Sequence, residues 1–390
     1  AQNGFPVSPI VARFLQAGYD KFLPYKDNPA MQHWFDTFAP GGHIPKTGEL
    51  MHLPDHAKTL RLLADSYCES LYRGELAAKI VEFSNATGGY VTLEDFADYH
   101  PEWQEPIHIN YRGYDVWEMP PNGHGITALM ALNILKGFDF PEKNCGETYH
   151  KQIEAMKLAF ADGMKYIADP RYMRTKVEEL LSEEYTDERR ALIGEKALDP
   201  VPGTPFCGGT VYLNAADDEG NMVSFIQSNY KDFGSGIVLP GYGLNLNCRA
   251  AGFSLDPASD DFLLPRKKPY HTIIPGFLTK DGKAVGPFGV MGAYMQPQGH
   301  VQVVMNTVDF LLNPQASLDA PRWQWIEGKR IWLEDRVPSE IIEDLRRRGH
   351  EITVKSDYTS FGRGEIIWRD DKGVLAGATE PRADGTVAAW

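Results

Sequence analysis

The sequence predicts a mixed α/β protein of the α+β kind, because helical and strand-like patterns occupy different parts of the chain. Up to about residue 200, apolar residues recur mainly at helical spacing. From Thr210 onward, two alternating runs flank a turn-rich stretch at 217–221, which predicts a hairpin. With 390 residues, of which 43% are hydrophobic and 24% charged, the chain is long enough to bury a full core.

Helices are expected through most of the first half of the chain, beginning with residues 1 to about 85. Residues 111–119 are expected to form the edge of a pair of strands. Thr148 is predicted to cap a long helix, and an acidic helical segment follows at 176–196. Another helix is predicted at 127–136. The apolar residues that carry the helical spacing are Ile10, Val11, Phe14, Leu15, Leu60, Leu63 and Leu71, then Ile153, Met156, Phe160, Met164 and Ile167 on the long helix.

A stretch dense in Pro and Gly, residues 200–209, is predicted to be a flexible linker between these parts. Strands are expected to dominate after it, until a helix at 298–312. A last helix at 338–348 is expected to end at Gly349, with the basic run 346–348 complementing its dipole.

Composition excludes several classes of function. A net charge of −14 argues against nucleic-acid binding, and no apolar run approaches the roughly 20 residues that span a bilayer. The four cysteines have no CxxC spacing, so inert or buried thiols are expected. Pro54 interrupts the one i,i+4 histidine pair, His52 and His56, which favours a helix start over a zinc site. Neither a GxSxG elbow nor a phosphate-binding loop is present, so no metal or cofactor is predicted.

The most informative segment is Gly208-Gly209-Thr210 at the start of the first predicted strand. If the backbone is cut between Gly209 and Thr210, Thr210 carries both a hydroxyl nucleophile and a free α-amine with a pKa of about 8. Two glycines allow the chain to bend so that the Gly209 carbonyl meets that hydroxyl. The alternative is an ordinary loop that enters an edge strand.

The context of Thr210 resembles a known family. The segment TVYLNAADDEGNMVSFIQSNYKDFGSGIVLPGYGLNLN, then RKKPYHTIIPGFLTKDGK, GPFGVMGAYMQPQGHVQVVMNTVDFLLNPQASLDAPRW and GATEPRADG, resembles the small subunit of the γ-glutamyltransferase family of N-terminal-nucleophile amidohydrolases. Residues 71–75, 91–95, 111–114 and EAMKLAFADGMKYIADPRY resemble its large subunit. The resemblance extends over the whole chain.

This resemblance implies a four-layer αββα sandwich, built from a large-subunit part at 1–209 and a small subunit at 210–390. The two parts are expected to stay together as a heterodimer, and whether that heterodimer dimerises further is left open. The resemblance also implies that the family's large subunit begins upstream of the segment that matches residues 1–9. The part without a counterpart supplies sandwich strands and an arginine that binds the substrate carboxylate in the family.

The resemblance assigns the chemistry to four residues. Thr210 is the nucleophile, and Ser228 stands where the family has a threonine whose hydroxyl bonds to it. Gly292 and Ala293 match the paired glycines whose N–H groups stabilise the oxyanion. The alternatives are a strand hydroxyl for Ser228 and a tight turn for the Gly292 loop.

The predicted substrate-binding residues depart from the transpeptidase pattern. Arg249 and Gly252 replace a glutamine and an aspartate that bind the α-amine of a glutamyl group, and His271 and Thr272 replace paired serines. Asn229 completes this set. An arginine prefers a carboxylate to an amine, so the pattern resembles the branch that includes oxamate amidohydrolase and enzymes described as cephalosporin acylases. Arg249 could also be an ion-paired surface residue, and His271 a core histidine.

We therefore expect a self-cleaving amidohydrolase that acts on a small carboxylate-bearing amide such as oxamate, through a threonyl acyl-enzyme. A glutathione hydrolase or γ-glutamyl transpeptidase is the alternative enzyme. The alternative from another class is an inactive precursor or a binding module.

Overall fold

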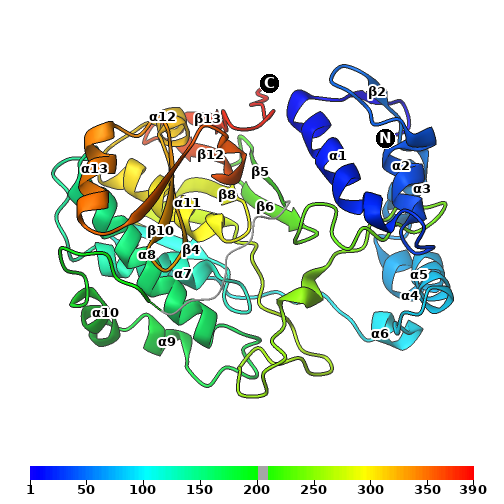
Figure 1. Cartoon of the computed structure of the whole chain (residues 1–390), viewed down its shortest axis with the longest axis horizontal. Coiled ribbons are helices and arrows are strands. Elements are labelled where there is room, and N and C mark those ends of the chain that lie inside the picture. Colours follow the sequence, from blue (N-terminus) through cyan, green and yellow to red (C-terminus); the bar gives the residue numbers. More distant parts are fainter. Residues whose placement is uncertain (201–209) are drawn as a thin grey trace. The chain divides into compact units, whose positions relative to one another are not determined.

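The computed structural model describes residues 1–200 and 210–390, which form two compact units (Figure 1). The first unit comprises Ala1–Trp103 and Asn229–Cys248, and the second comprises Gln104–Ser228 and Arg249–Trp390. Both units therefore contain residues from each side of Thr210, and cleavage at that point stays a prediction. Among the described residues, no helix is both long and apolar enough to cross a membrane.

The first unit is mostly helical, as its apolar spacing predicts, with one short antiparallel strand pair. Its α3 begins at Pro54, which confirms the expected helix start beside His56. Its elements are β1 (Phe5–Pro6), α1 (Pro9–Phe22), α2 (Gln32–Phe38), β2 (Leu50–Met51), α3 (Pro54–Asp65), α4 (Glu69–Arg73), α5 (Glu75–Ala86) and α6 (Leu93–Ala97).

Segment 229–248 completes the core of this unit, although it is far from the helices in sequence. Val238 is buried in the same cluster as Trp34 and Phe22. Leu239 and Tyr242 are buried with Leu76 in a second cluster. The two ends of the segment meet, because the Cys248 N–H donates to the Asn229 carbonyl over 3.1 Å. Residues 229–248 thus leave the chain of the second unit, pack in the core of the first unit, and return.

The second unit contains a six-stranded sheet in which every neighbouring pair is antiparallel, in the order β13-β12-β8-β7-β4-β3. Separate from it are the hairpin β5–β6 and a three-stranded sheet, β11-β10-β9. The strands are β3 (Ile107–Tyr111), β4 (Tyr114–Glu118), β5 (Thr210–Ala216), β6 (Met222–Ser228), β7 (Gly276–Lys280), β8 (Lys283–Met291), β9 (Trp323–Glu327), β10 (Arg330–Glu334), β11 (Glu351–Lys355), β12 (Arg363–Arg369) and β13 (Leu375–Thr379).

The helices of this unit are close to the predicted ones. The last helix ends just before Gly349, whose φ of 98° suits a glycine helix stop. The helices are α7 (Gly125–Leu135), α8 (Gly146–Tyr166), α9 (Val177–Leu180), α10 (Glu183–Arg190), α11 (Met295–Val308), α12 (Pro314–Asp319) and α13 (Ser339–Arg347).

Two sequence expectations are wrong in detail. Thr148 does not cap α8: Cys145 is the cap, and the Thr148 hydroxyl instead donates to the Glu142 carbonyl over 2.6 Å. Residues 253–275 are largely irregular rather than strand, because side chains satisfy their backbone groups; Lys267 Nζ, for example, donates to two carbonyls of this loop. The three cysteines that the structure describes are not buried, which leaves the expectation that they are inert as a prediction.

Alternation along β8 separates the two faces of the six-stranded sheet. Phe288 and Val290 point to α11, where they contact His300 and Gly299. Gly289 between them points to the other face, where a Cβ would lie 2.5 Å from the Tyr212 ring of the hairpin. Helices therefore cover one face of the sheet and β5–β6 covers the other.

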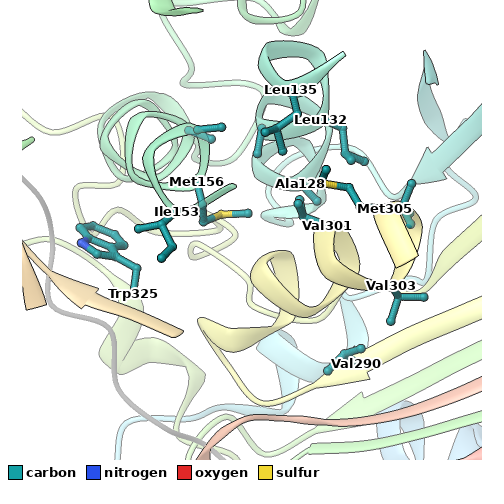
Figure 2. Packing of buried hydrophobic residues seen from close by; sticks show 14 of the residues in the cluster. Ala128, Leu132, Leu135, Ile153, Met156, Val290, Val301, Val303, Met305 and Trp325 are labelled. Atoms are coloured by element: carbon teal, nitrogen blue, oxygen red, sulfur yellow. The ribbon is translucent and has the colours of Figure 1, made fainter. Parts of the chain in front are cut away.

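The helix side forms one continuous core (Figure 2). There α11 lies between β8 and α7, and α7 packs against α8. The buried residues labelled in the figure are Ala128, Leu132, Leu135, Ile153, Met156, Val290, Val301, Val303, Met305 and Trp325. Helix layer, sheet and hairpin give three successive layers, whereas Val211, Leu213, Val223 and Phe225 on the outer side of the hairpin are exposed.

Candidate active site

Thr210 is the first residue of β5, and the hairpin register brings it to Ser228. The two residues are direct partners across the strands, and the Thr210 hydroxyl donates to Ser228 Oγ over 3.0 Å. Thr210 is 5% exposed. The structure thus joins the predicted nucleophile to its predicted hydroxyl partner, although they are 18 residues apart. Gly209, the other side of the predicted cleavage point, lies outside the described residues, as does the linker at 201–209.

The packing of the hairpin on β8 shows where Thr210 lies along the sheet. Tyr212 faces Gly289, and two residues further on Asn214 Nδ2 donates to the Pro287 carbonyl over 3.3 Å. The strands β5 and β8 therefore run in opposite directions. Two residues before Tyr212 and two residues after Gly289, Thr210 lies level with Met291. The oxyanion loop predicted at Gly292 and Ala293 begins at this level.

Gly292 and Ala293 form a sharp turn between β8 and α11. Both have positive φ, 144° and 50°, and Ala293 is 1% exposed. Their carbonyls accept from the N–H groups of Met295 and Gln296, which start the helix. Within the described part of the chain, neither N–H group of the turn donates a hydrogen bond. Two adjacent donors at the positive end of a 14-residue helix can therefore bind an oxyanion.

A tyrosine pair connects this turn to the predicted substrate-binding segment. The rings of Tyr270 and Tyr294 stack with their centroids 6.1 Å apart, and each is the chain neighbour of a predicted site residue. Further along the segment, the Ile274 N–H donates to Gln296 Oε1 over 3.2 Å. Sequence analysis missed both tyrosines. Their only sequence signal is their position beside His271 and Ala293.

Arg249 is buried rather than on the surface, with 7% of the residue exposed. Its Nη1 donates to Thr272 Oγ1 over 2.7 Å, so Thr272 orients the guanidinium. Burial, together with the Arg249 charge, lowers the pKa of His271 to about 3, so His271 is neutral at physiological pH. Gly252 lies close to the segment that carries His271 and Thr272, because a Cβ at Gly252 would be 3.3 Å from the Tyr270 carbonyl.

Asn229 is the one predicted site residue that belongs to the first unit, where its carbonyl accepts from Cys248. Its predicted substrate contact stays a prediction. Thr210, Ser228, Arg249, Gly252, His271, Thr272, Gly292 and Ala293 all belong to the second unit.

A buried group that has the composition of a metal site, His150, Glu154 and His350, already contains a cation. The ammonium of Lys157 lies 2.7 Å from Glu154 Oε1 and 3.5 Å from His350 Nδ1. His150 Nε2 donates to the Gly194 carbonyl, which leaves its Nδ1 to accept from His350 Nε2 over 2.8 Å. Each ring nitrogen of the two histidines has a partner in this arrangement, and burial lowers the pKa of both histidines, so they are neutral.

Comparison with known proteins identifies the family. The family profile described as Gamma-glutamyltranspeptidase matches residues 1–390. The chain belongs to this family. Its members are N-terminal-nucleophile hydrolases, so the protein is an enzyme of that class.

Relatives with different activities match along the whole chain. A glutathione hydrolase-like proenzyme of Bacillus subtilis is 34% identical over 99% of this chain and 74% of its own. Oxamate amidohydrolase proenzyme of Klebsiella pneumoniae is 32% identical over 100% and 74%. The crystal structure of a cephalosporin acylase from Bacillus halodurans has a TM-score of 0.96 and 59% identity, covering 100% of this chain and 72% of the acylase. The family fold is therefore mixed α/β, as predicted.

Proposed function

We propose that the chain cleaves itself before Thr210, and that Thr210 then hydrolyses a small amide that carries a carboxylate, such as oxamate. The observation that carries the substrate class is Arg249, a buried cation that Thr272 orients and that has a neutral histidine beside it. A guanidinium held in this way suits a carboxylate and repels an ammonium group. The relative named oxamate amidohydrolase agrees with this class.

Self-cleavage uses the same atoms as the later reaction. The Thr210 hydroxyl attacks the carbonyl of Gly209, and its proton passes to the departing Thr210 nitrogen, which leaves an ester and a free α-amine. Water then hydrolyses the ester and releases the carboxyl end of the large fragment. The relatives described as proenzymes support this step.

In turnover, the α-amine of Thr210 takes the hydroxyl proton while Oγ attacks the substrate carbonyl. The N–H groups of Gly292 and Ala293 stabilise the tetrahedral oxyanion, and the amine returns the proton to the leaving nitrogen. Water hydrolyses the acyl-enzyme. Before the attack, the hydrogen bond between the two hydroxyls holds Thr210 Oγ beside Ser228.

Glutathione hydrolysis is the second candidate, favoured by the relative that is 34% identical. A γ-glutamyl donor presents a cationic α-amine, which here meets Arg249 and no aspartate at Gly252. A missing charged hydrogen bond together with repulsion is expected to weaken recognition on the order of a hundredfold or more in kcat/KM.

Steady-state rates with oxamate, glutathione and a γ-glutamyl anilide separate the two candidates. We expect turnover of oxamate and poor turnover of the γ-glutamyl donors; efficient release of glutamate from glutathione reverses the ranking. The double variant Arg249→Gln/Gly252→Asp is expected to shift activity toward γ-glutamyl donors. Gly252→Ala is its matched control, because any Cβ at this position lies 3.3 Å from the Tyr270 carbonyl. A full-length chain that neither cleaves itself nor turns over any donor supports the inactive alternative.

A further inference from the structure

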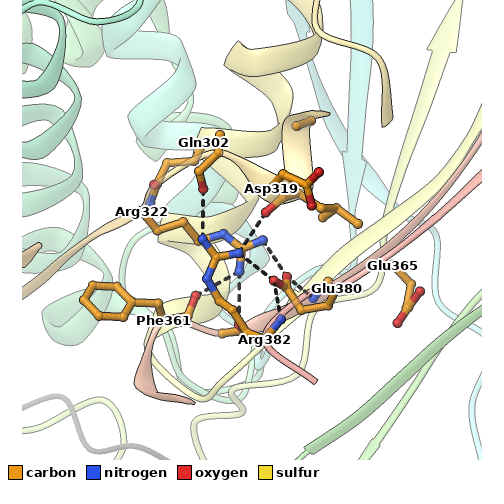
Figure 3. Close-up of polar contacts among 12 residues, drawn as sticks. Gln302, Asp319, Arg322, Phe361, Glu365, Glu380 and Arg382 are labelled. Carbon is orange, nitrogen blue, oxygen red and sulfur yellow. Dashed lines mark hydrogen bonds and ion pairs between the residues drawn. The ribbon is translucent and has the colours of Figure 1, made fainter. Parts of the chain in front are cut away.

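The closing motif of the chain, which includes Glu380 and Arg382, contributes to a buried charge cluster that the mechanism above does not use. We call it the arginine cluster and define it by five residues. It consists of Arg322, Glu334, Arg336, Glu380 and Arg382. Figure 3 shows its central part. All but Arg336 are at most 5% exposed.

Inside the cluster, charged groups alternate in sign. Glu380 accepts from Arg322 Nη2 over 2.7 Å and from Arg382 Nη1 over 2.6 Å. Arg382 Nε donates in turn to Glu334 over 2.6 Å. Removing these four charges from water is unfavourable unless their geometry is well matched, so the four buried members hold their neighbours in well-defined positions only while all four are present.

The cluster also holds backbone, and the segment that it holds is 361–364 (Figure 3). Arg322 Nη1 donates to the carbonyls of Phe361 and Gly362, each over 3.0 Å. Glu380 Oε2 accepts from the Gly364 N–H over 2.8 Å. One ion pair thereby fixes three backbone groups at the start of β12.

This segment lies directly behind the Gly292 turn. Arg363 pairs with Met291 across the sheet. A Cβ at Gly292 would lie 3.1 Å from the Gly362 α-carbon, and one at Gly362, whose φ is 77°, would lie 2.9 Å from the Met291 carbonyl. The two backbones therefore lie close together, with the Val290 and Met295 side chains packed beside them, so a displacement of Gly362 displaces the turn.

We propose that Arg322 and Glu380 are positioning residues, which set the Gly292 and Ala293 N–H groups by holding segment 361–364 against the turn. The catalytic part of this inference rests on the proposed function, in which those N–H groups bind the oxyanion. Neither residue is assigned to contact substrate.

The test uses two conservative variants in the full-length protein. Arg322→Lys keeps the charge and loses the guanidinium, whose Nη1 donates to two carbonyls while its Nη2 donates to Glu380. Glu380→Gln keeps the shape and loses the charge. Arg336→Gln is the matched control, because Arg336 donates to Glu334 in the same cluster but has no described bond to segment 361–364. Gly362→Ala displaces the segment without changing the cluster.

The first measurement is amide hydrogen exchange of a peptide that contains Gly292 and Ala293, compared with one from β5–β6. We expect faster exchange of the turn peptide in Arg322→Lys, Glu380→Gln and Gly362→Ala, and wild-type exchange in Arg336→Gln. Unchanged exchange at the turn in folded Arg322→Lys and Glu380→Gln overturns the proposal, whatever the activity. Because this readout needs no turnover, faster exchange in a protein without amidase activity sustains the positioning role and refutes the proposed function.

The second measurement is kcat and KM per titrated active site. An oxyanion donor acts in the transition state, so we expect kcat to fall about 10- to 100-fold with KM within about twofold, equally for oxamate and for neutral oxamide. A merely structural role lowers the melting temperature and the fraction of active sites but leaves kcat per site unchanged, and that result also overturns the proposal.

Discussion

The two halves of the candidate site are built by different means. The nucleophile half, Thr210 and Ser228, is set by the backbone register of a regular hairpin, and both side chains are small and uncharged. The recognition half, Arg249 to Thr272, begins in a short 3-10 helix at Arg249–Gly252 and continues through largely irregular chain. It depends on a buried charge that one hydroxyl orients. The proposed nucleophile is therefore placed by strand pairing, whereas the proposed recognition of substrate charge depends on side chains that can change without altering the sheet.

The difference predicts that variants of the two halves fail in different ways. Changes in the nucleophile half are expected to lower processing and turnover for every substrate. Changes in the recognition half are expected to lower turnover of carboxylate-bearing substrates and to leave turnover of neutral ones nearly unchanged. The four predictions that follow test this separation, beginning with the largest expected effect.

Thr210→Ala is expected to leave one uncut chain and to lower amidase activity by a factor on the order of 10⁴ or more, because the nucleophile of both reactions is gone. Intact mass measures the cut, and N-terminal sequencing of the wild-type small fragment should begin at Thr210. Thr210→Ser is the control, since it retains a hydroxyl and should still cleave. Two fragments from Thr210→Ala would mean that an external protease makes the cut.

Arg249→Ala is expected to lower kcat/KM for oxamate by about 10- to 150-fold, the equivalent of a charge-assisted contact worth about 1.5–3 kcal/mol, and to leave oxamide nearly unchanged. Self-cleavage should continue, because the recognition half has no part in it. Thr272→Val removes the hydroxyl that orients Arg249 and should give a smaller loss of the same kind. Equal losses for acid and neutral amide would show that Arg249 is structural.

Ser228→Ala is expected to slow self-cleavage and turnover by about 2- to 12-fold for charged and neutral amides alike, because one hydrogen bond of about 0.5–1.5 kcal/mol to the nucleophile is lost. Ser224→Ala is the matched control: Ser224 lies on the same strand and bonds to the Tyr212 hydroxyl over 2.7 Å, away from Thr210. Rates in a time course of intact mass measure processing. Similar slowing in both variants would indicate a general effect on the hairpin.

The hairpin that carries Thr210 and Ser228 was predicted from the sequence more completely than its surroundings. The alternation around 217–221 gives the hairpin and its turn, but it cannot tell which face of β6 is buried, and Ser228 was chosen by resemblance. Burial of Arg249 was not predictable, because the groups that enclose it come from chain about 20 residues away in irregular conformation. The arginine cluster was visible only as a motif, since its members are spread from 322 to 382.

The smallest effect on activity is expected from pH, to which the two halves of the site respond over different pH ranges. Burial raises the pKa of Asp261, which accepts from the Tyr270 N–H over 3.2 Å, to about 7. Between about pH 4 and 7 the folded protein keeps a proton that the unfolded chain has lost, so the free energy of unfolding falls as pH rises through that window. Asp261→Asn should reduce this slope by at most about 1.4 kcal/mol per pH unit, measured by denaturant unfolding at several pH values.

Glu365→Gln is the comparison for that variant, because burial raises the pKa of Glu365, on β12, to about 7 as well. Both variants should flatten the stability curve, but only Asp261→Asn should alter KM for oxamate, and only above about pH 7, where wild-type Asp261 is ionised, since Asp261 bonds to the segment that carries His271. Turnover by the nucleophile half should instead rise as the Thr210 α-amine loses its proton near pH 8. A rise in kcat at the pKa of Asp261, rather than at the pKa of the Thr210 α-amine, would contradict the separation of the two halves.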